Sequence, residues 1–427
     1  MKQLVRASLA AMLLVIAGAA ARAADLTVWG LQTFNTAADE YLGEMVKDFG
    51  KQAGIDAQYV VVPANVLNQR LAAAFEAHTP PDAFMQGSGA IQFYIARGLL
   101  IPIDDVLAEM RKAPGGIYEN LVSAGAWQGT IQAVPLEVDT VPMFVRKDLL
   151  DEIGKPVPAT WEELREDALA IQKKHPQISG FGMTVSNSND AESAIRIVMW
   201  CFGGKVMADD GKSVVFDSPE TRAAYQFVAD MFAKDRTIPR SALTWDDAGN
   251  NVAYQTGRAA FVINPPSIYQ WLQQNDQKLL ASTLMVSVPK GPGAKGMVGN
   301  AGGDWTWSVS KDSKHQDQAK AWLKYFFASD HYKVAIEKVG GRWWPVYPGM
   351  VRSIPLFADN PAYAQFDMLA RTSIIDGYAG PPNALSGKVW DATILTKALQ
   401  KVLVDGASVD DAVTWGQAQI EALAKAP

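Results

Sequence analysis

Residues 133–164 read AVPLEVDTVPMFVRKDLLDEIGKPVPATWEEL, a stretch that combines a strand, two carboxylates and the start of a helix. Residues 143–145 are apolar and lie between prolines, which predicts a buried strand. Thr160 and Glu163 have the spacing of a capping box, in which each side chain accepts a hydrogen bond from the other residue's backbone N–H. We therefore expect a helix from about Trp161, after a segment that Pro156 and Pro158 hold extended.

Glu137 and Asp139 stand just before this strand and allow two interpretations. Carboxylates at a strand end are often solvated and have no further role. Carboxylates that face a binding site can instead accept hydrogen bonds from hydroxyl groups of a solute. The sequence leaves both interpretations open, as well as which of the two acids would face a ligand.

The first 23 residues have the pattern of a secretory signal peptide. Lys2 and Arg6 precede an uncharged apolar run over residues 7–21, which is shorter than the about 20 residues that span a bilayer. Ala21-Arg22-Ala23 then forms an Ala-x-Ala cleavage site. We expect an exported, periplasmic protein that is cleaved near Ala23 and has no lipid anchor, because no cysteine follows the site.

Charge and cysteine content exclude several classes of protein. Cleavage would remove three basic residues and no acid, so that the formal charge would go from −6 to −9. An acidic protein is a poor candidate for binding the phosphate backbone of nucleic acids. The single cysteine, Cys201, excludes an internal disulfide, and its apolar neighbours indicate a buried thiol.

The order of elements in the N-terminal part indicates an α/β protein. Residues 26–29 read as a strand, a helix is expected from about Asp39, and residues 55–62 read as a second strand. This order favours a parallel sheet covered by helices, in which ligands bind beyond the carboxyl ends of the strands. About 400 mature residues are too many for one core, so we expect two lobes. No low-complexity linker separates them, which indicates that strands connect the lobes.

Several segments together resemble the extracellular solute-binding proteins of bacterial ABC importers, in particular the carbohydrate-binding, maltose-binding-protein-like family. The segments are Val134-Pro135, the Arg-Lys-Asp-Leu-Leu turn at 146–150, the Pro-x-Thr-Trp-Glu-Glu-Leu helix start at 158–164, residues 255–264, residues 299–311 and the Gly-x-x-Pro return at 340–345. The resemblance implies two lobes, each a mainly parallel sheet flanked by helices, with a ligand cleft between them. It assigns residues 24–138 and 303–330 to the N-terminal lobe and residues 139–302 and 331–427 to the C-terminal lobe. The chain would cross near 138–141, 299–303 and 328–333.

This resemblance implies a binding protein rather than an enzyme, monomeric and without a cofactor, with a sugar and the membrane subunits of an ABC permease as partners. Tryptophans in loops offer flat apolar surfaces to a pyranose, although packing between lobes is the alternative for each. Carboxylates and amides would select among hydroxyl positions. By resemblance, Asp139 and Asp304 lie at the two crossovers, and Ser267 stands where relatives often have tryptophan. The expected ligand-binding residues are Trp29, Gln86, Ser88, Glu137, Asp139, Asn264, Asp304, Trp305, Arg342 and Trp343.

Other chemistry has little support in the sequence. The four histidines are scattered, so no metal site is expected. Residues 308–311 fit Ser-x-x-Lys, but no Lys-Thr-Gly accompanies them. An exported glycoside hydrolase remains a rival, which an assay for released reducing sugar would exclude. A binding protein for a polyol or for glycerol phosphate is a second alternative, although an anionic solute calls for a cluster of basic residues and only Arg342 is obvious. The sequence does not say which sugar binds, or whether it is a mono- or an oligosaccharide.

Overall fold

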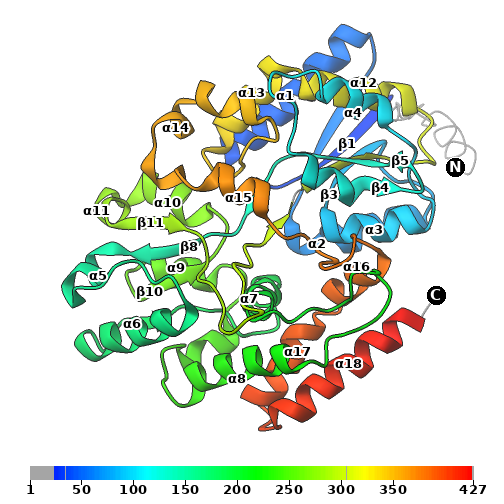
Figure 1. Cartoon of the computed structure of the whole chain (residues 1–427). Coiled ribbons are helices and arrows are strands. Elements are labelled where there is room, and N and C mark those ends of the chain that lie inside the picture. Colours follow the sequence, from blue (N-terminus) through cyan, green and yellow to red (C-terminus); the bar gives the residue numbers. More distant parts are fainter. Residues whose placement is uncertain (1–23, 34, 304, 426–427) are drawn as a thin grey trace, which may run out of the picture.

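The computed structural model describes residues 24–33, 35–303 and 305–425, and two β-sheets with helices on their faces organise this part of the chain (Figure 1). The predicted signal peptide and Asp304 lie outside the described residues. The first sheet has the strand order β2-β1-β3-β13-β6: β2 (Ala57–Val62), β1 (Leu26–Leu31), β3 (Ala83–Gly87), β13 (Trp305–Val309) and β6 (Ala133–Pro135). The second has the order β11-β8-β10-β9: β11 (Thr283–Val286), β8 (Met143–Arg146), β10 (Ala259–Ile263) and β9 (Ser179–Phe181).

Both sheets are mixed, whereas the sequence led us to expect mainly parallel ones. β1 runs parallel to β2 and β3, as the strand, helix, strand order predicted. β13 is antiparallel to β3 and β6, and β8 is antiparallel to β10 and β11. β9 runs parallel to β10, so each sheet contains pairs of both kinds.

Helices cover these sheets in two groups. In Figure 1 the helices around the first sheet, here called the upper group, lie at the top and right of the molecule, and those around the second sheet, the lower group, lie at the left and bottom. The upper group comprises α1 (Thr36–Ala53), α2 (Ala64–Glu76), α3 (Ser88–Ala96), α4 (Asp104–Met110), α12 (Gln316–Phe327) and α13 (Ser329–Val339). The lower group comprises α5 (Lys147–Ile153), α6 (Trp161–Lys174), α7 (Asn189–Cys201), α8 (Pro219–Ala233), α9 (Gly249–Gln255), α10 (Ser267–Asn275), α11 (Gln277–Ala281), α17 (Ile394–Leu403) and α18 (Val409–Lys425). Of three further helices, α15 (Phe366–Thr372) and α16 (Ala384–Asp391) lie between the groups, and α14 (Pro355–Ala358) lies at the upper left.

Local signals place the helix starts. Thr160 and Glu163 form the predicted capping box, with Glu163 N donating to Thr160 Oγ1 at 3.2 Å, and α6 begins at Trp161 as expected. The first helix begins at Thr36 rather than about Asp39, because the Asn35 side chain accepts hydrogen bonds from the amides of Ala37 and Ala38.

Buried apolar side chains form two clusters, one for each sheet. The first contains Val28, Phe84 and Trp307 with Trp322, and it extends onto one face of the second sheet. The second contains Trp161, Phe181, Met199, Phe261 and Leu399. Trp322 is buried as predicted, and so is Cys201, whose thiol has its pKa raised to about 11 by burial.

Two short strands connect the clusters. β7 (Asp139–Thr140) pairs in antiparallel fashion with β12 (Gly302–Gly303), where the sequence predicted two crossovers. Next to this pair, Val138 N donates to Trp344 O at 2.8 Å and Trp344 N donates back to Val138 O at 3.4 Å. The predicted lobe boundaries stay a prediction. They assign most of α13 to the C-terminal lobe, but this helix packs against α1, which lies beside the first sheet.

Candidate functional site

The two carboxylates of the 133–164 stretch lie at the connection between the sheets. Glu137 is 0 % exposed, and its Oε1 accepts a hydrogen bond from Trp305 N at 3.2 Å. Its depth rules out the interpretation of Glu137 as a solvated strand end. Asp139 opens β7 and is half-buried, and burial raises its pKa to about 6 although the positive charge of Arg342 acts in the opposite direction.

Arg342 brings the first sheet close to this connection. It follows α13, and its Nη1 donates to the backbone oxygen of Thr33, just beyond the carboxyl end of β1, at 3.1 Å. The same guanidinium acts electrostatically on Asp139 and on Asp190 of α7. The Arg342 side chain therefore interacts with the end of β1, with β7 and with α7, which belongs to the helices around the second sheet.

Asp190 and Asn250 belong to this polar group, and the sequence analysis missed both. Burial raises the pKa of Asp190 to about 7, with further contributions from the negative charges of Asp247 and Asp139. Asn250 Nδ2 donates to Asp190 Oδ2 at 3.0 Å and to Asn264 Oδ1 at 2.9 Å. In the sequence Asp190 looks like an ordinary acidic residue in the first turn of a helix, so no local signal distinguishes it.

The amides expected to bind ligand are largely occupied within the protein. Asn264 accepts from Asn250 and donates to Ser267 Oγ at 3.0 Å and to the backbone oxygen of Pro265 at 2.8 Å. Gln86 donates to Asn68 Oδ1 at 2.9 Å and accepts from the backbone of Gly87 at 2.8 Å. These two side chains hold their neighbours in place in this conformation. Ser267, where relatives often have tryptophan, is a polar partner of Asn264.

Three expected tryptophans have different surroundings. Trp305 is half-buried, pairs with Gly87 in the first sheet and lies next to Glu137. Trp29 is half-buried as well, but the guanidinium carbon of Arg70 lies 4.9 Å from its ring centroid. Trp343 is 1 % exposed and belongs to the first apolar cluster. Trp305 is therefore the one of these three tryptophans whose backbone amide is seen to bond to a carboxylate of the 133–164 stretch.

The structure thus brings together some of the expected residues and not others. Ser88 begins α3 directly after Gly87, the residue that pairs with Trp305, and so joins the same end of the first sheet. We call the joint set the crossover cluster. It comprises Ser88, Glu137, Asp139, Asp190, Asn250, Asn264, Trp305 and Arg342. Trp29, which packs against Arg70, and Trp343, which is buried in the first apolar cluster, are not counted in this set.

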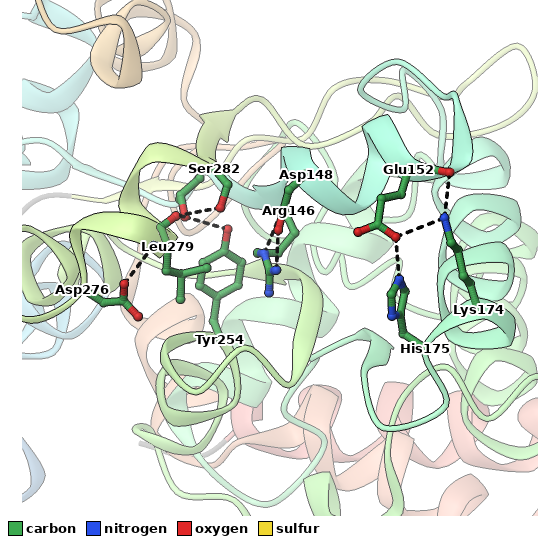
Figure 2. Close-up of polar contacts among 10 residues, drawn as sticks. Arg146, Asp148, Glu152, Lys174, His175, Tyr254, Asp276, Leu279 and Ser282 are labelled. Atoms are coloured by element: carbon green, nitrogen blue, oxygen red, sulfur yellow. Dashed lines mark hydrogen bonds and ion pairs between the residues drawn. The ribbon is translucent and has the colours of Figure 1, made fainter.

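Charged residues away from the crossover cluster pair with one another on the surface of the second sheet (Figure 2). Glu152 contacts Lys174 at 3.1 Å and His175 at 2.9 Å, and Arg146 contacts Asp148 at 2.6 Å. His175 is thus occupied by its contact with Glu152. Among residues 24–33, 35–303 and 305–425, no three histidine, cysteine or acidic side chains are grouped so that they could hold a metal ion.

The crossover cluster is rich in acceptors. Its carboxylates can accept hydrogen bonds from hydroxyl groups, its guanidinium can donate hydrogen bonds, and Trp305 offers an apolar face. The arrangement is suited to holding a polar, uncharged solute by hydrogen bonds.

Comparison with known proteins identifies the class. The family model described as bacterial extracellular solute-binding protein matches residues 34–333, and the chain belongs to this family of binding proteins, which are not enzymes. Within the described part of the chain, no helix has both the length and the apolar character to cross a membrane.

Individual relatives are distant in sequence and close in fold. A binding protein of Brucella abortus (strain 2308) is 25 % identical over 294 residues, which cover 68 % of this chain and 69 % of the relative. The diacetylchitobiose-binding protein DasA of Streptomyces coelicolor is 23 % identical over 339 residues, covering 74 % and 72 %. Maltose-bound MalE3 of T. maritima superimposes with a TM-score of 0.80 at 22 % identity, over 93 % of this chain and 99 % of that one. The predicted α/β periplasmic-binding-protein fold is confirmed.

Proposed function

We propose that this protein is the periplasmic sugar-binding component of an ABC transporter, which captures a mono- or oligosaccharide and delivers it to the permease. The observation that carries the proposal is the crossover cluster: where β7 and β12 connect the sheets, Glu137 bonds to the amide of Trp305, and the charge of Arg342 acts on both Asp139 and Asp190. Membership of the solute-binding family supports capture without chemistry. A maltose-bound structure and a diacetylchitobiose-binding protein among the similar proteins support a carbohydrate.

Capture would proceed by hinge closure. The β7 and β12 pair is short, and Gly302 and Gly303 form one of its two strands, so it can bend without disturbing either core. A solute that contacts groups of both lobes stabilises the closed form over the open one. The permease would recognise that closed form. The protein would act as a monomer, exported and cleaved near Ala23 without a lipid anchor.

Asp139, Asp190 and Glu137 would accept hydrogen bonds from sugar hydroxyls, and Trp305 would stack on the sugar ring. A site built on such hydrogen bonds rejects an analogue that leaves a buried polar group unpaired. A polyol remains the alternative ligand, because it presents the same hydroxyls. Glycerol phosphate is disfavoured, because its negative charge would meet three carboxyl groups, of which Glu137 is buried and Asp139 and Asp190 are half-buried.

Titration of the purified mature protein with a panel of ligands tests the proposal. The panel holds neutral mono- and oligosaccharides, polyols and glycerol phosphate, and calorimetry with intrinsic tryptophan fluorescence is the measurement. Saturable binding of a sugar, with no reducing sugar released over hours, supports the proposal. Binding of glycerol phosphate alone, binding of a polyol alone, or turnover of a glycan contradicts it.

A further inference from the structure

Helix α16 lies directly on helix α3, and two glycines allow the close approach. A Cβ added at Gly387 of α16 would lie 2.8 Å from the backbone oxygen of Gly89 in α3, closer than real Cβ atoms come. The two helices pack along each other at this point. In Figure 1, α16 lies between α3 above and α17 below. The backbones therefore touch, and no side chain separates them here.

α16 is fixed to the second sheet's core. Val389 in the middle of α16 is buried in the second cluster, and α16 packs against α17 and α18. Asn383 caps the helix in a capping box with Ser386, and its side chain also donates to the backbone oxygen of Gly211 at 3.1 Å. The contact between α16 and α3 consequently joins the two halves of the molecule.

A buried ion-pair network holds the segment that precedes α16 against the same place. A Cβ on Gly89 would clash with Asp376 Oδ2, so this carboxylate covers the first turn of α3. Asp376 Oδ1 lies 3.5 Å from Arg196 Nη1, and Arg196 Nη2 donates to Glu192 Oε1 at 3.0 Å. The Arg196 guanidinium also lies 5.0 Å from the ring centroid of Trp390 on α16. Asp376 and α16 thus approach α3 as one unit.

A chain of hydrogen bonds connects the other end of α16 to the first sheet. Gln86 Nε2 of β3 donates to Asn68 Oδ1 of α2 at 2.9 Å, and Asn68 Nδ2 donates to Asp391 Oδ1 at 3.2 Å. Asp391 is the last residue of α16. These two hydrogen bonds connect β3 of the first sheet to α16, which packs on the core of the second sheet.

The contact covers one end of the crossover cluster. α3 begins at Ser88, directly after Gly87, which pairs with Trp305, whose N–H donates to Glu137. We infer that α16 closes this end of the site when the lobes close, an inference that rests on the proposed sugar-binding function. The ligand is then a mono- or disaccharide. A third sugar unit running past the start of α3 would meet Gly387, Asp376 and the backbone of α3, and it would have to push α16 away.

A series of increasing chain length tests the inference. The probes are glucose, maltose, maltotriose and maltotetraose, with the β-1,3-gluco- and chito-oligosaccharides as parallel series, each titrated by calorimetry. We expect affinity to fall by about tenfold or more between the disaccharide and the trisaccharide of the series that binds. Trisaccharides or longer sugars that bind as tightly as the disaccharide overturn the inference and leave the proposed function standing. If no sugar of any length binds, the proposed function fails and the inference falls with it.

Gly387→Ala provides the structural test. Alanine favours a helix more than glycine does, so α16 itself remains formed, but the new methyl group pushes α16 away from Gly89. We expect the affinity ratio of trisaccharide to disaccharide to rise at least about threefold, with the melting temperature of the variant reported alongside. Asp391→Ala, which removes the bond to Asn68, should change the ratio in the same direction.

Gly43→Ala is the matched control. It also places alanine in a helix, α1, and its Cβ would meet Tyr59 Cδ1 at an ordinary 3.7 Å. This variant should bind every sugar as the wild type does. An unchanged length profile in both Gly387→Ala and Asp391→Ala contradicts the closing role of α16.

Discussion

Asn250 Nδ2 donates to Asp190 Oδ2 at 3.0 Å, and this bond ties α9 to the first turn of α7. The bond favours the charged form of Asp190, yet burial and the charges of Asp247 and Asp139 outweigh it and raise the pKa of Asp190 to about 7. Asp139 has its pKa raised by burial to about 6. The crossover cluster therefore holds two carboxyl groups that titrate well above their ordinary range.

Stability should depend on pH through these two groups. Between the ordinary pKa of 3.8 and the raised values, the native state binds more protons than the unfolded state. The free energy of unfolding therefore falls as pH rises from about 4 to about 7, and the loss is complete above that range. Thermal melts across this range should show the decline, and Asp190→Asn should flatten it. Asp312→Asn, at an exposed surface pair, should leave the slope unchanged. A wild-type slope in Asp190→Asn would show that Asp190 does not carry the effect.

Replacing the crossover carboxylates should weaken sugar binding. Glu137→Gln keeps an oxygen for the amide of Trp305 but loses the negative charge. Asp139→Asn, at the start of β7, likewise keeps the size of the side chain and loses its charge. Because hydrogen bonds to charged acceptors are the stronger ones, each change should raise Kd about tenfold or more, measured by calorimetry, with an unchanged far-UV CD spectrum. Glu162→Gln, at an exposed position on α6, is the control. Wild-type affinity in both variants would remove Glu137 and Asp139 from the site.

The sequence predicted features whose partners are close along the chain. Thr160 and Glu163 are three residues apart, and their spacing alone reveals the helix start. The crossover cluster depends on long-range contacts instead: Asp190 and Asn250 are 60 residues apart, and Arg342 reaches Thr33 across 309 residues. Such contacts leave no periodic pattern, so Asp190 and Asn250 could not be recognised. Turn context likewise failed to separate Trp305, beside the carboxylates, from the buried Trp343.

Trp305→Ala should affect binding more than stability. The side chain is half-buried beside Glu137, and its backbone amide, which bonds to Glu137 Oε1, survives the substitution. Loss of the stacking surface should raise Kd for the sugar about tenfold or more. Calorimetry measures the affinity, and far-UV CD checks the fold. If the variant binds sugar as well as the wild type, Trp305 is a packing residue.

Trp343→Ala should show the opposite pattern. The indole is 1 % exposed within the first apolar cluster, so its removal leaves a cavity. Large-to-small changes of this kind cost about 3–5 kcal/mol of unfolding free energy, which urea denaturation would measure. Sugar affinity of the folded protein should stay within about threefold of the wild type. A large loss of affinity without a loss of stability would return Trp343 to the binding site.

Thr160→Ala should lower stability while leaving sugar binding intact. Thr160 Oγ1 accepts the hydrogen bond of Glu163 N at 3.2 Å, and Glu163 Oε2 accepts from Thr160 N at 3.2 Å, so the variant leaves one amide of the first turn unsatisfied. Loss of such a cap costs about 1 kcal/mol, which should appear as a lower urea midpoint with an unchanged m-value.

Thr256→Ala is a suitable control, because that hydroxyl bonds to backbone oxygens at the end of α9 rather than to an unpaired amide. An equal loss of stability in both variants would show that the cap of α6 contributes nothing specific. Because α6 lies on the second core away from the crossover cluster, a change in sugar affinity in Thr160→Ala would indicate that the site extends further than the cluster defined by Glu137 and Asp190.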